Sequence, residues 1–401
     1  MKQAYLIDGV RTPIGNFGGS LSTIRTDDLA AMVIEKLMNK QINVDKAAID
    51  DVILGCANQA GEDNRNVARM ALLLAGLPFS VPGETVNRLC ASGLSAAIHA
   101  ARAIQSGDGN IFIAGGVENM TRGPWVISKA SSPFGRDSEM FDSSFGWRFI
   151  NPKMKELFGV DAMGETAENL AERFKISRED QDKFACWSQE KARIAIANNR
   201  FSDEIMQVPI PQKRKEPILF GKDEFSKPTT TIETLATLKP AFRKNGTVTA
   251  GNASGLNDGA AALLFASEEG IKQFNLSPIA RIVSMGVAGV EPAFMGMGPI
   301  PASEIALKKA GLSINDMDVI EINEAFASQV LTCLRGLGIA DNDPRVNPNG
   351  GAIALGHPLG MSGARILNTA ALELQRQNKK YALVTMCIGV GQGYAVIIEK
   401  C

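Results

Sequence analysis

An internal repeat between the two ends of the chain constrains the fold more than any other feature. The stretch IDDVILGCANQA (49–60) resembles MDVIEINEAFAS (317–328), since each combines an acidic turn, an apolar strand and a polar junction. The repeat extends further, because AYLIDGVRTP at the start resembles ARIVSMGVAGVEP from residue 280, and NIFIAGGVENM resembles YALVTMCIGVGQG. This repetition predicts two similar halves.

The spacing inside the repeat links two reactive residues. Asp51 precedes Cys90 by 39 positions, and Asp318 precedes His357 by 39 positions as well. Cys90 and His357 are therefore expected at matching points of the two halves.

Strands alternate with amphipathic segments of helical length in both halves. The clearest of these segments span residues 28–39, 91–105, 303–310 and 362–376. Such alternation favours a mostly parallel sheet covered by helices. The predicted class is α/β.

The 401 residues suggest more than one structural unit. Residues 121–244 are richer in polar and charged side chains, and KRKEPILFGKDEFSKPTT within them has no clear period, which predicts a loop. A helix is expected from about residue 178, where a serine precedes an acidic first turn. We divide the chain into a first half of residues 1–120 and 245–275, an inserted loop domain of residues 121–244, and a second half of residues 276–401.

The composition is that of a globular chain without a polyanionic partner. Apolar residues make up 45% and the formal net charge is −1, with no basic stripe that could neutralise phosphates, so we expect no nucleic acid. No apolar run approaches the roughly 18 residues of a membrane span, and the start lacks the pattern of a signal peptide. We expect a cytoplasmic protein without membrane contact. The 6 cysteines form no C-x-x-C pair, which argues against zinc and predicts reduced thiols.

Cys90 lies between a strand-like ETVNRL and the helical pattern of ASGLSAAIHAARAI. Backbone N–H groups at a helix start stabilise a thiolate and lower its pKa, so the position suits a nucleophile. A cysteine at such a junction more often serves packing, however. The choice depends on the partners that the rest of the chain supplies.

The chain has 2 histidines that could serve as a base for this thiol. His99 falls inside the predicted helix and away from its apolar stripe, which indicates a structural or surface role. His357 stands in NPNGGAIALGHPLGMSGARIL, where glycines and prolines hold an irregular backbone that a packing histidine would not require. This context favours a functional role for His357.

Two further apolar strands end in polar or reactive residues. Cys387 ends YALVTMC and precedes IGVGQG and another strand, which predicts a tight hairpin rather than a nucleotide-binding loop. Such a hairpin can direct backbone N–H groups at an oxyanion. Asn323 and Glu324 follow DVIEI, and they are either a helix cap or a pair of site groups that orient a water.

Taken in chain order, Cys90, NEAF, GHPLGMSGAR and CIGVGQG resemble the thiolase family of acyl-CoA acyltransferases. The resemblance spans nearly the whole chain and includes VRTPIGNFGG, AGGVENM, MGETAEN and TAGNASGLNDGA. It implies the thiolase fold: two similar βαβαβαββ halves in a layered αβαβα arrangement, with an inserted loop domain over the coenzyme A site. It also implies a homodimer or homotetramer, coenzyme A and acyl-CoA as substrates, and no metal or redox cofactor.

The same resemblance implies a role for each site residue. Cys90 becomes the acylated nucleophile, His357 the base that activates it, and Cys387 the acid/base that exchanges a proton with the α-carbon of acetyl-CoA. Asn323 would hold a water that forms one oxyanion site with His357. The N–H groups of Cys90 and Gly389 would form the other.

The family pattern also implies residues that contact coenzyme A. These are Met163, Phe242, Ala253, Ser254 and Phe326 beside the pantetheine, and Lys227 near a phosphate. For Lys227 a solvated surface charge is an equal alternative.

Within the family, GWRFINP and the final loop Val390-Gly391-Gln392 resemble the 3-oxoadipyl-CoA thiolases of aromatic-compound catabolism. Ala162 stands where acetoacetyl-CoA thiolases usually carry a histidine before Met-Gly, which argues against a short acyl chain. A dicarboxylic acyl chain needs a partner for its distal carboxylate. Arg148 in GWRFINP is our hypothesis for that partner, with a surface loop arginine as the alternative.

Other functions stay open at this stage. An acetyl-CoA acetyltransferase or a general 3-ketoacyl-CoA thiolase would use the same residues. A β-ketoacyl synthase shares the fold but usually carries histidines where this chain has Asn323 and Cys387. A non-catalytic acyl-CoA-binding protein would be expected to have lost at least one of Cys90, His357 and Cys387.

Overall fold

A computed structural model describes residues 2–401, and its largest feature is a mixed β-sheet with strands from both ends of the chain. The strands of this sheet are β1 Tyr5–Arg11, β2 Gly15–Asn16, β3 Asp51–Gly55, β4 Gly83–Val86, β5 Ile111–Asn119, β10 Asn257–Ala266, β11 Ala280–Gly289, β12 Val319–Ile322, β13 Tyr381–Ile388 and β14 Gln392–Lys400. Their order is β12-β13-β14-β11-β1-β10-β5-β3-β4, with β2 on β10. Two separate hairpins add β6 Trp125–Ile127 with β7 Met140–Asp142, and β8 Val208–Gln212 with β9 Lys215–Phe220.

The sheet contains the repeat that the sequence predicts. The first half has the order β1-β10-β5-β3-β4, and the second has β11-β14-β13-β12 followed by a parallel bridge between Ile320 and Val346 in place of β4. β1 and β11 join the halves through antiparallel pairs at Tyr5 and Leu6. The expectation of two similar halves is therefore confirmed.

The expectation of a mostly parallel sheet is wrong. Only β3 with β4, β3 with β5, and β12 with β13 run parallel among the described strands. β14 returns directly from β13 through a hairpin, and β10 enters antiparallel to β5, so each half gains a strand that reverses direction. Periodicity identifies a strand but not its direction.

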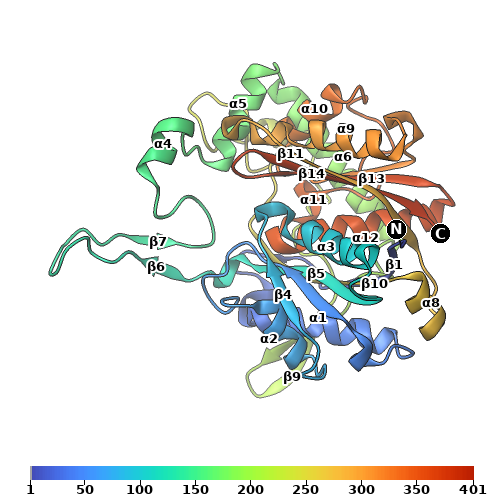
Figure 1. The fold of residues 1–401 in the computed structure, drawn as a ribbon. Coiled ribbons are helices and arrows are strands. Elements are labelled where there is room, and N and C mark those ends of the chain that lie inside the picture. Colours follow the sequence, from blue (N-terminus) through green and yellow to red (C-terminus); the bar gives the residue numbers. More distant parts are fainter. Residues whose placement is uncertain (1) are drawn as a thin grey trace.

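The helices form three layers around the two halves of the sheet. They are α1 Thr26–Lys40, α2 Val67–Leu74, α3 Ser92–Ser106, α4 Pro152–Phe158, α5 Met163–Arg173, α6 Arg178–Ala197, α7 Ile232–Ala236, α8 Glu268–Phe274, α9 Pro299–Ala310, α10 Ala327–Gly336, α11 Ala352–Leu355 and α12 Leu359–Gln377. Figure 1 shows α3 and α12 side by side between the two halves of the sheet, with α1 and α2 on one outer side and α9 and α10 on the other. In residues 2–401, each helix is too short or too polar to span a membrane.

The apolar cores follow these layers. In the central core, Leu94 and Ile98 of α3 and Leu367 of α12 pack with Phe265 of the first half and Val396 of the second. The burial of each such side chain stabilises the fold by about 1.5–3 kcal/mol. Because both halves share this core, the first turns of α3 and α12 are held against the same edge of the sheet.

The predicted helices are present with small shifts at their ends. Residues 28–39 lie in α1, and the helix expected from residue 178 is α6, which Ser177 caps by accepting the N–H of Asp180 at 3.0 Å. α9 begins at Pro299 rather than at residue 303, because proline suits the first helical position.

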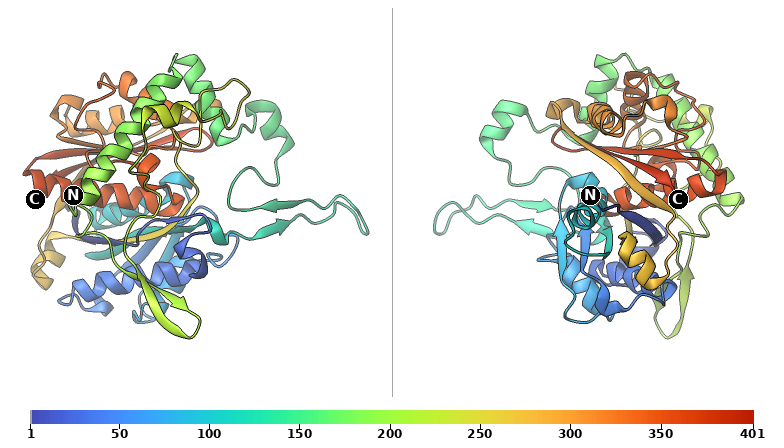
Figure 2. Two further views of the ribbon diagram at one scale, coloured as in Figure 1. Left: turned by 180° about the vertical axis from the view of Figure 1, so that it is seen from behind. Right: turned by 45° about the vertical axis from the view of Figure 1, so that its right-hand side comes forward.

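The predicted loop at KRKEPILFGKDEFSKPTT is partly wrong. Its first part forms β9, which pairs with β8 around a turn at Arg214, whose φ is 58°. Ile218 and Leu219 of β9 are exposed, so this strand lacks the alternation of buried and exposed residues that would have identified it. The other hairpin, β6 with β7, projects away from the body of the molecule (Figures 1 and 2).

Candidate active site

Cys90 lies in a 3₁₀ turn between β4 and α3. Leu89 before it has a φ of 46°, which is rare for a residue with a side chain. Asn87 Oδ1 accepts the Leu89 N–H at 2.9 Å, and Ser92 Oγ accepts the Arg88 N–H at 2.9 Å while donating to the Leu89 carbonyl at 2.7 Å. These bonds hold the strained backbone in place, as at other functional turns.

The surroundings of Cys90 keep it a thiol. Burial raises the pKa of Cys90, while the backbone N–H groups of Gly389 and of Cys90 itself lower it by a smaller amount. The expectation that the helix start lowers this pKa overall is wrong, because desolvation of the thiolate outweighs the two N–H groups. The charge of Glu118 raises the pKa further. Cys90 therefore requires a base before it can act as a nucleophile.

The hydrogen bonds of His357 favour the tautomer that a base for this thiol needs. Its Nδ1 lies 2.6 Å from Ser362 Oγ, and the Ser362 hydroxyl donates to the carbonyl of Pro358 at 2.9 Å. A hydroxyl has one hydrogen, and that of Ser362 is used in the bond to Pro358. Nδ1 of His357 must therefore be protonated and donate the hydrogen bond to Ser362 Oγ. Nε2 then carries the lone pair, 3.3 Å from Asn323 Nδ2.

The protonation state of His357 agrees with this tautomer. Burial, followed by the positive charge of Arg365, lowers the pKa of His357 to about 3. The ring is 4% exposed and is neutral at pH 7. A neutral imidazole with a free Nε2 can accept a proton from a thiol.

Asn257 of β10 fixes the backbone at this histidine. Its Oδ1 accepts the His357 N–H at 2.9 Å and its Nδ2 donates to the Gly15 carbonyl at 3.0 Å. Gly356 has a φ of 104°, and a Cβ there would lie 2.7 Å from the Asn257 side chain, so this position requires glycine.

The backbones of α3 and α12 touch where these two turns meet. A Cβ added at Gly93 would lie 2.4 Å from the Gly360 carbonyl oxygen, and one at Gly363 would lie 2.4 Å from the Leu94 nitrogen. Glycines therefore permit an approach that no larger residue allows. The approach brings the turn of Cys90 and the turn of His357 together.

Cys387 lies near the end of β13, in an apolar cluster with Ala253, Phe326 and Met295. Burial, then the neighbouring thiols of Cys90 and Cys333, raises the pKa of Cys387 well above its usual value. A protonated thiol at neutral pH is suited to donate a proton. The tight hairpin expected after it is present between β13 and β14.

Two of the residues expected beside the pantetheine, Ala253 and Phe326, share the apolar cluster of this thiol, and the other three contact neighbouring residues. A Cβ added at Gly389 would lie 3.6 Å from Met163 Sδ. Phe242 packs against Gly164 and edge-on against Phe326, with ring centroids 6.2 Å apart. Ala253 forms a backbone bridge with Phe326, and the Ser254 N–H donates to the Ala325 carbonyl at 3.0 Å.

Two expected binding residues stand apart from this group. Lys227 is exposed, and its Nζ lies 5.6 Å from the centroid of the Phe225 ring. Arg148 donates to the Ser143 carbonyl at 2.9 Å and to Asn58 Oδ1 at 3.4 Å. The residue before Arg148 does line a small pocket, whose walls are Trp147, Phe158, Gly159, Asp161, Met163, Thr166, Pro292, Ala293 and Val390.

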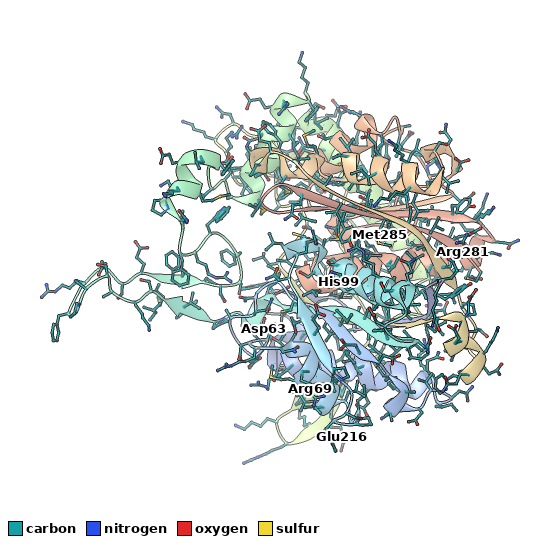
Figure 3. The ribbon with its side chains drawn as sticks, viewed as in Figure 1. Asp63, Arg69, His99, Glu216, Arg281 and Met285 are labelled. Atoms are coloured by element: carbon teal, nitrogen blue, oxygen red, sulfur yellow. The ribbon has the colours of Figure 1, made fainter. Side chains whose placement is uncertain are left out.

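His99 and Glu324 do not join the site. His99 is half-exposed on α3, with Nδ1 3.8 Å from Glu84 Oε1, which agrees with a surface role (Figure 3). Glu324 is buried and accepts hydrogen bonds from Ser188 Oγ and Asn347 Nδ2, at 2.6 Å and 2.7 Å. Asn323 therefore contacts His357, whereas Glu324 supports the fold, and neither residue caps α10.

Sequence reasoning missed Ser362, Asn257 and Glu118. The available signals were a serine five residues after the histidine, an asparagine at the end of TAGNASGLN, and an acidic residue closing the apolar strand IFIAGGVE. Glu118 also belongs to the one group of potential metal-ligating side chains found in residues 2–401, with Cys56 and Asp63. The ligand atoms of that group lie within 4.8 Å of one another.

Comparison with known proteins identifies the family. The family "Thiolase, N-terminal domain" matches residues 4–269, and "Thiolase, C-terminal domain" matches residues 276–400. The chain belongs to the thiolase family. This thiolase is 59% identical over 400 residues to the 3-oxoadipyl-CoA/3-oxo-5,6-dehydrosuberyl-CoA thiolase of Escherichia coli K12, with 100% of both chains covered.

Other relatives agree with this result. The thiolase is 55% identical to a β-ketoadipyl-CoA thiolase of Acinetobacter baylyi, again with 100% of both chains covered. The crystal structure of the Bacillus anthracis acetyl-CoA acetyltransferase matches with a TM-score of 0.93 at 41% identity, covering 100% of this chain and 99% of that one. The family and the fold expected from the sequence are both confirmed.

Proposed function

We propose that this thiolase cleaves 3-oxoadipyl-CoA with coenzyme A, giving succinyl-CoA and acetyl-CoA in the catabolism of aromatic compounds. The observation that carries the chemistry is the neutral His357, whose proton is fixed on Nδ1 by Ser362 and whose Nε2 faces Asn323. The substrate is supported by the full-length relatives at 59% and 55% identity, whose names specify this dicarboxylic substrate.

The first half-reaction acylates Cys90. His357 Nε2 takes the proton of the Cys90 thiol, and the sulfur attacks the C3 carbonyl of the 3-oxoacyl-CoA. We assign the tetrahedral oxyanion to the backbone N–H groups of Cys90 and Gly389, and their effect on the pKa of the Cys90 sulfur supports this assignment. The intermediate then breaks its C2–C3 bond and leaves succinyl as a thioester on Cys90.

The electron pair of the broken bond passes into the enolate of acetyl-CoA. His357, with a water held by Asn323, would stabilise the enolate oxygen. Cys387 gives its proton to C2 and becomes a thiolate. The high pKa of Cys387 supports this role, because the thiol is fully protonated before the step.

The second half-reaction releases the acyl group. The Cys387 thiolate takes the proton of the incoming coenzyme A thiol, whose sulfur attacks the Cys90 thioester. The resulting tetrahedral intermediate expels the Cys90 sulfur, which recovers a proton from His357. Succinyl-CoA leaves and every group has returned to its initial state.

Substrate contacts follow from the positions of the side chains. We assign the pantetheine to Met163, Phe242, Ala253, Ser254 and Phe326, whose proximity to Cys387 and Gly389 supports the assignment. Lys227 is assigned to a phosphate of coenzyme A on its exposed charge alone. Arg148 is assigned to the distal carboxylate, because its neighbour Trp147 shares a pocket with Met163.

The same chain is proposed to act as a homodimer or homotetramer. The projecting hairpin of β6 and β7 carries four exposed apolar side chains, Trp125, Ile127, Phe134 and Met140. Side chains of this kind favour burial in an interface. Sedimentation velocity of the wild type tests this, and a monomer at micromolar concentration would contradict it.

The function is tested by following the enolate absorbance of 3-oxoadipyl-CoA and of acetoacetyl-CoA after addition of coenzyme A. We expect rapid loss with the dicarboxylic substrate, slow loss with acetoacetyl-CoA, and no loss with Cys90→Ala. Equal or faster cleavage of acetoacetyl-CoA would instead support an acetyl-CoA acetyltransferase. Absence of cleavage of either substrate by the wild type would refute the proposed activity.

A further inference from the structure

Glu118 is a buried carboxylate that no step of the proposed mechanism uses. It lies near the end of β5 with 2% of its surface exposed. Its Oε1 accepts the Asn58 N–H at 3.0 Å, and its Oε2 accepts the Ala57 N–H at 3.0 Å and the Gly360 N–H at 2.9 Å. One side chain thus joins the turn after β3 to the first turn of α12.

One arm of this connection leads to the base. Gly360 is the third residue after His357, and its N–H is one of those that a helix start leaves without an intrahelical partner. The bond from Gly360 to Glu118 therefore fixes the first turn of α12, which carries both the Pro358 carbonyl and Ser362. The orientation of the imidazole depends on that turn.

The other arm leads to the nucleophile. The Ala57 carbonyl accepts a hydrogen bond from Asn87 Nδ2 at 2.9 Å, and Asn87 Oδ1 holds the Leu89 N–H at 2.9 Å. Glu118 accepts the N–H of Ala57. The carboxylate is therefore connected, through the backbone of Ala57 and the side chain of Asn87, to Leu89, the residue before Cys90.

We propose that Glu118 is a positioning residue that sets the geometry between the Cys90 sulfur and the His357 imidazole. The inference rests on the roles proposed above for these two residues. It adds a group that never touches substrate and acts through the backbone on both.

The carboxylate's own contacts favour bracing over metal binding. Both oxygens of Glu118 are already engaged by backbone N–H groups. In the same cluster, Cys56 Sγ donates to Asp63 Oδ2 at 3.5 Å, and Asp63 Oδ1 accepts the Gly61 N–H at 2.9 Å. Figure 3 labels Asp63 on the side of the molecule from which the β6–β7 hairpin projects.

Replacement of Glu118 by glutamine removes one of the acceptor oxygens while keeping the shape of the side chain. The amide NH₂ would face backbone N–H groups that require an acceptor. We expect Glu118→Gln to lower kcat and the rate of Cys90 alkylation by iodoacetamide in parallel, by about 10- to 100-fold, as for loss of a buried charge-assisted bond. The KM for coenzyme A should stay within twofold of wild type.

Glu373→Gln is the matched control. Glu373 is a buried carboxylate in the last turns of α12, where it accepts a hydrogen bond from Asn349 Nδ2 at 2.9 Å. Its loss should lower the thermal midpoint without changing the alkylation of Cys90. Alkylation is followed by mass spectrometry of the Cys90 peptide, so the other thiols do not contribute.

The outcomes separate this inference from the proposed function. If the wild type cleaves substrate and Glu118→Gln alkylates within twofold of the wild-type rate, the inference is wrong. If the wild type cleaves neither substrate, the proposed function fails instead, and the alkylation rates still report on Glu118. Should Glu118→Gln not fold, Asn87→Ala breaks the other arm; a drop in alkylation supports the inference and an unchanged rate overturns it.

Discussion

Replacement of Ser362 by alanine tests the tautomer of His357 directly. In the wild type the Ser362 hydroxyl donates a hydrogen bond to the Pro358 carbonyl and accepts one from the His357 Nδ1–H. In Ser362→Ala that proton has no acceptor in a ring that is 4% exposed. The alternative tautomer moves the proton to Nε2, where it meets the Asn323 Nδ2 donor and removes the lone pair that Cys90 needs.

The expected loss of kcat in Ser362→Ala can be estimated from the hydrogen bond that the Nδ1–H loses. A buried N–H without an acceptor costs about 1–3 kcal/mol. If that cost falls on the step in which His357 acts, kcat drops by about 5- to 150-fold. The KM for coenzyme A should not change, because Ser362 contacts none of the residues assigned to coenzyme A.

The assay is steady-state thiolysis combined with alkylation of Cys90. Ser362→Thr keeps a hydroxyl and should retain most of the activity. Thr332→Val is the matched control, because Thr332 Oγ1 makes the same bond to a helix carbonyl, that of Ser328 at 2.8 Å, without a histidine partner. A Ser362→Ala enzyme with kcat within twofold of wild type would refute the assigned tautomer.

Three other predictions concern charge. Because burial raises the pKa of Cys90 and lowers that of His357 to about 3, alkylation of Cys90 should keep rising above pH 9; a plateau from pH 5 to 8 would indicate a thiolate–imidazolium pair instead. Burial raises the pKa of Glu321 to about 8 from an unfolded value near 4.5, so its contribution to stability is full below pH 4.5 and is lost as the pH rises through 8. Glu321→Gln should therefore lose less unfolding free energy between pH 5 and pH 9 than wild type in urea titrations, and an equal loss would count against this pKa. Arg148→Ala should raise the KM for 3-oxoadipyl-CoA about tenfold or more, as for a lost charged hydrogen bond, and leave that for acetoacetyl-CoA unchanged; a parallel change in both would assign Arg148 to the loop.

The sequence predicted the two similar halves that the structure shows, and it supplied the reactive residues that the proposed mechanism uses. The equal spacing from Asp51 to Cys90 and from Asp318 to His357 predicted two halves, and the structure places both residues at starts of central helices. Spacing is informative here because a repeat of strand and helix lengths fixes where each helix begins.

Strand direction and long-range hydrogen bonds could not be predicted from the sequence. An apolar run predicts burial on both faces of a strand but not whether its neighbour is parallel, so the general expectation of a mostly parallel sheet missed the antiparallel pairing of β10 with β5. Asn257 lies 100 positions from His357, and Glu118 lies 242 positions from Gly360. Contacts over such separations leave no local pattern in the chain.

The direction of the Cys90 pKa shift also depends on contacts that the local sequence does not show. A helix start correctly predicted N–H groups near the sulfur, but the depth of burial decides the sign of the shift. Burial at this site comes from α12 and the β13–β14 hairpin, both far along the chain.

The acyl-enzyme itself provides the most direct test of the mechanism. Wild-type protein is mixed with 3-oxoadipyl-CoA in the absence of free coenzyme A, quenched in acid, digested and analysed by mass spectrometry. The mechanism predicts a succinyl group on the Cys90 peptide, released acetyl-CoA in equal amount, and loss of the label on addition of coenzyme A. A label on another residue, or acetyl-CoA release without any acylated Cys90, would contradict it.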